Sequence, residues 1–415
     1  MRANLITFFS GLCIVVVATF ASIIGAEFCL RVTNIPPEPQ FGWKWSSSPY
    51  KSDANIRDVR VNDLGLRGRP IAYDEHDFVI VLVGDSYIEA GAQPYADMPE
   101  QILENLLTNK YGFKRVRVFS VASAGWGQDQ ELLSLGAYFS RFRADLVLMW
   151  LTPINDYWEN GNVDRNVHSG AGPLKPTFQL INHSELRLEY PQKFQFKIRL
   201  LLEKTIASLR GGAGGLEQFY VQQWLDKLPP SNITPAPPAF CPSTDVDQLD
   251  VVASFQRGGG RVTAVTTEDL DHARSHFSHF LVPISMRERY QINITHRLIE
   301  ETTKLAVAHG ATFRAFYPRG SDIDRALSLV KCVKDQTGNY YLTDFSDLVF
   351  DLRESNLKEM LLDIDITSRT PNCISSRDWH LNRDGNVMAM DALAQQLLAN
   401  GLLQQGMASK PSHDP

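Results

Sequence analysis

The residues best suited to chemistry are a serine in a tight turn and a histidine far downstream of it. Ser86 follows a Gly-Asp pair directly after the apolar run Phe78 to Val83, and His380 lies in the sequence Asp-Trp-His-Leu-Asn. A serine hydroxyl is a poor nucleophile at neutral pH, but a neighbouring histidine can activate it by accepting its proton. The two residues therefore predict acyl transfer through a serine nucleophile.

Three further residues would complete such a site. Asp378 is the nearest carboxylate before His380 and could orient the imidazole through its other ring nitrogen. The backbone N–H groups of Ser86 and Gly125 and the side-chain amide of Asn155 could stabilise the oxyanion that forms on a substrate carbonyl. A glycine at position 125 also lets the backbone approach the reacting atoms closely.

Each of these residues also has a purely structural interpretation. Ser86 suits a turn, Gly125 the end of a strand, and Asn155 the N-cap of a helix. His380 could lie on the surface near another helix start, and Asp378 could cap that helix. Their ordered occurrence after separate strand-like runs favours the catalytic interpretation.

The elements that must position these residues are parallel strands. The run Phe78 to Val83 is continuous and β-branched, which is typical of a strand buried on both faces. Val116 to Val121 is predicted as a second strand despite Arg117, and Leu146 to Leu151 as a third. An apolar-periodic helix is predicted from about Val387 to Leu398. Residues that follow such strands meet at one edge of the sheet. We therefore predict an α/β fold with three layers, α/β/α, around a central parallel sheet.

These blocks, in this order, resemble the SGNH hydrolases, also called the GDSL-type esterase and lipase superfamily. The resemblance covers residues 78 to 160 and 311 to 400. It implies a flavodoxin-like sheet with Ser86 as the nucleophile, His380 as the general base and Asp378 as its orienting acid. It also implies an oxyanion hole formed by Ser86, Gly125 and Asn155.

Two details of the sequence qualify this resemblance. Many members of the superfamily place the acid three residues before the histidine, whereas Asp378 precedes His380 by two. Because of this difference in spacing, the assignment of His380 is firmer than that of Asp378.

The run Val61 to Gly68, with the sequence VNDLGLRG, also resembles a lead-in found in membrane-anchored bacterial members.

The resemblance implies a serine esterase that acts on an O-acyl group of a carbohydrate through an acyl-enzyme intermediate, with no cofactor and no metal. The expected partner is an acylated small molecule or polysaccharide. Two alternatives stay open. The chain could be an O-acyltransferase of a cell-envelope polysaccharide, in which a sugar hydroxyl attacks the acyl-enzyme, or a non-catalytic envelope binding module that retains the fold.

The N-terminal segment from Leu5 to Ala26 is almost wholly apolar and carries no charge, so it is long enough to cross a bilayer as a helix. A signal peptide cleaved near Gly25 and a buried core helix are the alternatives. The long apolar core favours a retained anchor. Arg2 and Arg31 flank the segment on opposite sides and do not determine its orientation. A short tail before a large domain, together with the resemblance, predicts a catalytic domain outside the cytoplasm, either periplasmic or extracellular.

The remaining sequence divides around these features. We predict an anchor in residues 1–30, a linker and lead-in in 31–77, the hydrolase-like domain in 78–400 and a tail in 401–415. An insertion at about 160–285 contains an amphipathic stretch from Phe194 to Leu209. It could form a lid or a peripheral packing module. A helix from Ser285 to His309 and a strand from Ala311 to Tyr317 follow. The net charge of −6 argues against a nucleic-acid partner.

Of the five cysteines, Cys13 and Cys29 accompany the apolar segment. Cys241, Cys332 and Cys373 allow one disulfide, and sequence does not choose the pair. We favour Cys332 with Cys373, because that bond would pin the loop before the catalytic histidine.

Two other motifs have simpler interpretations than a ligand site. The histidines His272, His276 and His279 could line a helical face as metal ligands, but acidic neighbours are equally ordinary on a solvated face. The run Gly258 to Gly260 lacks the strand-loop-helix context of a phosphate loop and is interpreted as a flexible loop.

Overall fold

The computed structural model describes residues 2–35, 42, 60–163, 174–182, 184–191, 196–209, 223–241, 278–328, 331–334, 338–345, 355–374 and 378–403. The strands in this part of the chain are β1 Phe78–Gly84, β2 Val116–Ala122, β3 Leu146–Trp150, β4 Thr177–Ile181, β5 Glu185–Glu189, β6 Leu281–Val282, β7 Thr312–Arg319, β8 Cys332–Lys334, β9 Tyr340–Thr343 and β10 Leu361–Asp365. The helices are α1 Arg2–Thr33, α2 Ser86–Glu89, α3 Pro99–Asn105, α4 Gln128–Tyr138, α5 Pro153–Asn160, α6 Lys197–Leu209, α8 Met286–Ala308, α9 Asp322–Leu327 and α11 Arg383–Ala399. Short turns of 3₁₀ helix occur at η1 Tyr95–Asp97, η3 Phe139–Arg141, η4 Pro238–Phe240, η5 Ser278–Phe280 and η6 Lys358–Met360, and η2 Leu106–Lys110 is a π-helical turn.

Five parallel strands form the central sheet, in the order β10-β7-β3-β1-β2. The chain first adds β2 on one side of β1 and then crosses to add β3 on the other side. This is the flavodoxin-like order, and its topological switch point lies at the carboxyl ends of β1 and β3. Ligands bind at that point in open α/β sheets, so the topology places a site where Ser86 and Asn155 emerge.

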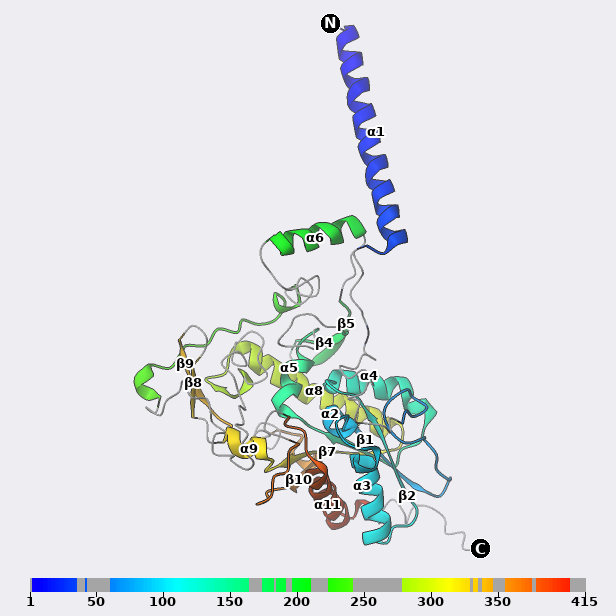
Figure 1. The fold of residues 1–415 in the computed structure, drawn as a ribbon, viewed down its shortest axis with the longest axis vertical. Coiled ribbons are helices and arrows are strands. Elements are labelled where there is room, and N and C mark those ends of the chain that lie inside the picture. Colours follow the sequence, from blue (N-terminus) through cyan, green and yellow to red (C-terminus); the bar gives the residue numbers. More distant parts are fainter. Residues whose placement is uncertain are drawn as a thin grey trace.

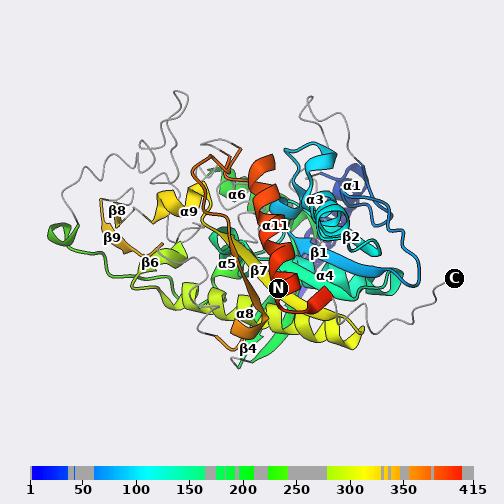
Figure 2. The same ribbon diagram turned by 90° about the horizontal axis from the view of Figure 1, so that it is seen from below.

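Helices cover both faces of this sheet, which confirms the predicted three-layer α/β fold (Figures 1 and 2). Alternate residues of β1 point into two separate cores. Ile80 and Leu82 pack with α3 and α11 on one face, whereas Val79 and Val81 pack with α4 and α8 on the other. Because both faces of β1 are buried, its residues are apolar without alternation.

The predicted strands before Ser86, Gly125 and Asn155 correspond to β1, β2 and β3, and the predicted later helices correspond to α8 and α11. The edge strand β10 was not predicted. Its Leu362 and Ile364 are buried while Asp363 and Asp365 are exposed, so the segment alternates instead of forming an apolar run. Residues 223–225 form a short helical turn.

The predicted insertion contains the hairpin β4-β5, the helix α6 and the strand β6. The hairpin β4-β5 packs beside α4 and α8, and β6, β9 and β8 form a three-stranded sheet with segments from both sides of α8. Neither sheet extends the central one.

The disulfide prediction was wrong, because Cys332 pairs with Cys241 and not with Cys373. An antiparallel bridge between Ala236 and Tyr340 brings the segment before Cys241 beside the β8-β9 sheet that carries Cys332. Cys373 is instead buried in the core beneath α11, where it forms a backbone bridge with Leu381.

Two of the weaker motifs lie mainly outside the described residues, namely His272 with His276, and Gly258 to Gly260. His279 is not on a solvated face. It is buried in η5, and its Nε2 lies 2.9 Å from Gln291 Oε1. No group of three or more His, Cys, Asp or Glu side chains suited to a metal occurs among the residues that the structure describes.

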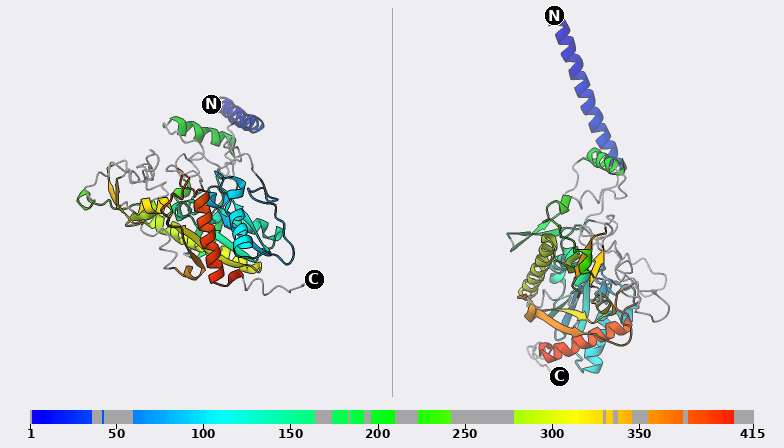
Figure 3. Two further views of the ribbon diagram at one scale, coloured as in Figure 1. Left: turned by 60° about the horizontal axis from the view of Figure 1, so that its bottom comes forward. Right: turned by 90° about the vertical axis from the view of Figure 1, so that its left-hand side faces the viewer.

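One described helix, α1, is long and apolar enough to cross a membrane. Its apolar stretch runs from Ser10 to Thr33 with a mean hydropathy of 2.2, and none of it is buried against the rest of the protein. Figures 1 and 3 show α1 projecting away from the globular part of the chain.

Candidate active site

Ser86 occupies the first position of the short helix α2, immediately after β1. Asp85 is the N-cap of this helix, and its Oδ1 accepts a hydrogen bond of 2.9 Å from Tyr87 N. Gly84 is required because a Cβ there would lie 2.7 Å from Ile88 Cγ1 and 3.3 Å from Trp150 Cβ. The strand-turn-helix geometry thus holds the serine hydroxyl at the carboxyl edge of the sheet.

Ser86, His380 and Asp378 form a continuous chain of hydrogen bonds. His380 Nε2 lies 2.7 Å from Ser86 Oγ, and His380 Nδ1 lies 2.6 Å from Asp378 Oδ1. The same carboxylate oxygen accepts a bond of 3.2 Å from His380 N, so it fixes both the ring and the backbone. Separation by two residues is therefore compatible with the orienting role. The N-cap of α11 is Asn382 and not Asp378, which contradicts the capping interpretation of the aspartate.

Backbone hydrogen bonds hold the histidine loop in the place where a disulfide was expected. Ile374 N donates to His380 O at 2.8 Å, and Asn382 N donates to Asn372 O at 2.9 Å. The Asn382 side chain adds a bond of 3.0 Å to Cys373 O. The loop is thus closed at its base without a covalent link.

The charges around His380 favour its protonated form. Burial alone would lower the pKa of His380, but the hydrogen bond and charge of Asp378, together with the charges of Asp85 and Glu89, raise it above its ordinary value. For Asp378, burial acts to raise the pKa, yet the hydrogen bonds and charge of His380 hold it below the usual range. The pair is suited to stabilising an imidazolium.

Tyr87, which the sequence analysis did not identify, packs directly against the histidine. Its ring centroid lies 5.0 Å from that of His380 and 5.6 Å from that of Trp150. Its hydroxyl donates to Trp379 O at 3.1 Å. Tyr87 therefore supports one face of the His380 ring, and its position beside Ser86 was the only signal in the sequence.

Gly125 and Asn155 lie at the same edge of the sheet as Ser86. Gly125 has φ +70°, a left-handed conformation that favours glycine, in the loop after β2. Asn155 lies in the first turn of α5, whose N-cap is Thr152, so the capping interpretation of Asn155 is wrong. Its Nδ2 donates a hydrogen bond of 3.1 Å to Asp85 Oδ2, the side chain that precedes the serine.

Buried carboxyl groups lie behind these residues. Burial raises the pKa of Asp85, and burial together with the charge of Asp85 raises that of Asp156 well above its usual range. Asp156 Oδ2 accepts bonds of 2.6 Å from Thr152 N and 2.7 Å from Gln128 Nε2. Thr152 begins the turn that carries Asn155, so Asp156 anchors that turn from behind.

The lead-in segment supports one wall of the site through Arg67, which is almost completely buried. Its guanidinium donates to Glu89 O at 2.8 Å, to Gln93 O at 2.6 Å and to Ala90 O. These carbonyls lie at the end of α2 and just after it. Glu89 Oε2 in turn accepts a bond of 2.5 Å from Ala124 N. A segment distant in sequence thus connects the nucleophile helix to the loop of Gly125.

A small pocket of about 170 Å³ opens at the serine. Residues that line it include Ser86, Tyr87, Gln93, Ala124, Ile374 and His380. Backbone and small side chains make up much of its wall, so the space beside the hydroxyl suits a short group.

Comparisons with known proteins give few matches. No family model matches the chain, and no curated protein matches it. Among solved structures, the acetyl xylan esterase AlAXEase is 13% identical with a TM-score of 0.25, over 77% of this chain and 98% of that one. An extracellular lipase from Streptomyces rimosus is 12% identical with a TM-score of 0.23, over 77% and 99%. A carboxylesterase structure from the thaumarchaeon Nitrososphaera gargenis is 9% identical with a TM-score of 0.26, over 85% and 99%. TM-scores of this size do not establish a shared fold, and the functional conclusion rests on the geometry of the site.

Proposed function

We propose that the protein is a serine esterase of the SGNH type, with Ser86, His380 and Asp378 as its catalytic residues. The observation that carries the proposal is the hydrogen-bonded chain from Ser86 Oγ through both ring nitrogens of His380 to Asp378. The same arrangement of nucleophile, base and orienting acid supports acyl transfer on unrelated folds.

The first half-reaction forms an acyl-enzyme. Ser86 Oγ attacks the carbonyl carbon of the ester while His380 Nε2 accepts the hydroxyl proton, and Asp378 stabilises the imidazolium. The negative charge on the former carbonyl oxygen is met by the backbone N–H groups of Ser86 and Gly125 and by the Asn155 amide. The intermediate then collapses, and the leaving alkoxide takes the proton from His380.

The second half-reaction repeats these steps with water. His380 accepts a proton as the water oxygen attacks the acyl carbon, and it returns that proton to Ser86 as the carboxylic acid leaves. Each proton lost by the nucleophile is thus restored, and the net change is one ester and one water converted to an acid and an alcohol.

We propose a short O-acyl group on a carbohydrate as the substrate. The carbohydrate follows from the resemblance of the four sequence blocks and of the VNDLGLRG lead-in to the superfamily. The short acyl group is supported by the pocket of about 170 Å³ at Ser86, which is smaller than the cavities of roughly 300 Å³ or more that bind larger ligands.

We also propose that α1 is a retained anchor that holds the catalytic domain outside the cytoplasm. Glu27 of α1 accepts hydrogen bonds of 2.9 Å from Lys197 N and 3.0 Å from Ile198 N, at the start of α6. A helix that contributes to the folded chain in this way is better suited to retention than to cleavage.

The proposal is tested by labelling the full-length protein with a fluorophosphonate and by measuring hydrolysis of a short-chain aryl ester. The label should attach to Ser86, and Ser86→Ala should lose both labelling and turnover while keeping the far-ultraviolet circular dichroism of the wild type. Ser123→Ala is the matched control, because Ser123 follows the neighbouring strand β2 and is buried. Full turnover in a folded Ser86→Ala protein, or transfer of the acyl group only to an added sugar, would contradict an esterase.

A further inference from the structure

The uncharged stretch of α1 ends just before Glu27, the residue that binds the start of α6. Leu5 to Ala26 carry no charge, and as a helix they extend about 33 Å, close to the roughly 30 Å of a bilayer's hydrocarbon core. The next residue, Glu27, is the first charge after this stretch. With α1 as the proposed anchor, this spacing would place Glu27 at the level where the hydrocarbon core gives way to the lipid headgroups.

Three hydrogen bonds fix the start of α6 at this level. The Glu27 carboxylate accepts the N–H groups of Lys197 and Ile198, and Lys197 Nζ donates to Asn34 Oδ1 at 2.8 Å. Figures 1 and 3 show the consequence, since α6 runs sideways from the lower end of α1 between that helix and the rest of the domain. Beside a helix that crosses the bilayer, a helix held in this way would run along the membrane surface.

One face of α6 is apolar and exposed. Leu202, Ile206 and Leu209 recur at helical spacing and have exposed fractions of 57%, 41% and 82%. Phe196, just before the helix, is also 58% exposed. Burial of these side chains in an apolar medium is favourable by about 25 cal/mol for each Å² removed from water.

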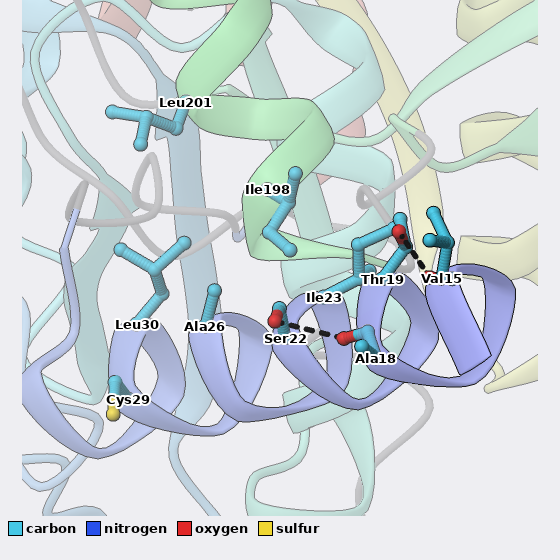
Figure 4. A pocket seen from close by; sticks show the side chains of 10 residues that line it. All are labelled: Val15, Ala18, Thr19, Ser22, Ile23, Ala26, Cys29, Leu30, Ile198 and Leu201. Atoms are coloured by element: carbon cyan, nitrogen blue, oxygen red, sulfur yellow. Dashed lines mark hydrogen bonds between the residues drawn. The ribbon is translucent and has the colours of Figure 1, made fainter. Parts of the chain in front are cut away.

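The apolar face of α6 continues onto α1. Ile198 and Leu201 line an apolar groove of about 790 Å³ together with Ala26 and Leu30 of α1 (Figure 4). Leu202 and Leu209 follow Ile198 by four and eleven residues, so helical spacing places them on the same face of α6 as this groove residue. The hydroxyl groups of α1 in the groove do not interrupt this surface, because Ser22 Oγ donates to the backbone of its own helix at 2.8 Å.

Lys197 is buried and bonded to Asn34, and the other charged residues of α6 are Arg199, Lys204 and a single acid, Glu203. Basic side chains beside an apolar face suit a surface of anionic headgroups above acyl chains.

We propose that α6 is a membrane-surface helix whose apolar face inserts into the outer part of the bilayer that α1 crosses. With α1, it provides two points of attachment and fixes the orientation of the domain relative to the lipid surface. This inference is independent of the proposed esterase activity, because it rests only on α1, α6 and the contacts between them.

The test places an environment-sensitive nitrobenzoxadiazole label on the full-length chain in vesicles of phosphatidylcholine and phosphatidylglycerol. Cys13→Ala and Cys29→Ala remove the exposed thiols, and Cys373 is buried. Leu202→Cys reports on the apolar face, and Lys204→Cys is the matched control on the polar side. A label at native Cys13, in a chain with Cys29→Ala, reports whether α1 is inserted.

Nitroxides on the lipid acyl chains should quench the label at position 202 about threefold more strongly than the label at 204, and an aqueous quencher should show the reverse order. The proposal is overturned if both labels are quenched alike, or if the label at Cys13 is open to the aqueous quencher. It is also overturned if neither quencher reaches position 202 until the protein is diluted with lipid, because a second copy of the chain would then cover the face.

Discussion

His380 Nε2 and Ser86 Oγ lie 2.7 Å apart although 294 residues separate them in the chain. The sheet explains this proximity, because β1 is an interior strand of the sheet and the loop between β10 and α11 places His380 at its carboxyl end. The backbone bonds between Asn372 and Asn382 and between Ile374 and His380 then fix the loop over the serine. The geometry is therefore present in the folded chain before any substrate binds.

The first prediction concerns the pH dependence of activity. His380 must be neutral to accept the Ser86 proton, and its raised pKa means that kcat/KM should rise with pH through a midpoint above the ordinary value of 6.5. Asp378→Ala removes the hydrogen bond and charge that raise this pKa, so the midpoint should move to lower pH. The measurement is the pH profile of aryl ester hydrolysis by both proteins.

The rates of the alanine variants of Ser86, His380 and Asp378 separate the base from its orienting acid. His380→Ala should approach the loss seen in Ser86→Ala, roughly 10⁶-fold in kcat, whereas Asp378→Ala should lose roughly 10⁴-fold. Equal rates for Asp378→Ala and the wild type, with an unshifted profile, would exclude the orienting role of Asp378.

The second prediction concerns Asn155. If its amide stabilises the oxyanion, Asn155→Ala should lower kcat by roughly 10²- to 10³-fold with little change in KM, because the donor matters most when charge has developed. Asn155→Asp keeps the shape of the side chain but removes the donor, and it should show the same defect. Steady-state kinetics of the two variants provide the measurement. A rise in KM with unchanged kcat would assign Asn155 to substrate binding.

Much of the fold was predictable because β1 and β3 are buried on both faces and are therefore continuous apolar runs, and β2 is interrupted only at Arg117 and Ser120. Ser86 was identified as a candidate because it follows such a strand, whereas His380 was identified from the Asp-Trp-His-Leu-Asn block. By contrast, β10 alternates Leu362 and Ile364 with exposed aspartates, and the partner of Cys332 depends on the packing of a small separate sheet. Side chains that act by packing, such as Tyr87, carry no motif of their own.

The third prediction concerns Arg67, which joins the lead-in segment to the end of the nucleophile helix. Arg67→Met would leave three carbonyl groups without their charged donor, at a cost of roughly 3–5 kcal/mol in the free energy of unfolding. The loss should be measured by urea unfolding of the detergent-solubilised chain. Arg141→Met is the control, because exposed Arg141 donates to Asp63 O in the same segment at 2.8 Å. Similar unfolding midpoints for the two variants would show that Arg67 does not support the wall.

The fourth prediction concerns Glu288, which closes the capping box of α8 by accepting a bond of 2.9 Å from Ser285 N. Burial raises its pKa from 4.5 to about 7. Between pH 4.5 and about pH 7, the Glu288 carboxyl keeps its proton in the folded state but loses it in the unfolded state. The contribution of Glu288 to the free energy of unfolding is therefore full below pH 4.5 and is lost as the pH rises toward 7. Glu288→Gln cannot titrate. The difference in unfolding free energy, wild type minus Glu288→Gln, should therefore fall by about 3 kcal/mol across this window. Urea unfolding at several pH values provides the measurement, with Glu301→Gln on the same helix as the control, and a constant difference would refute the prediction.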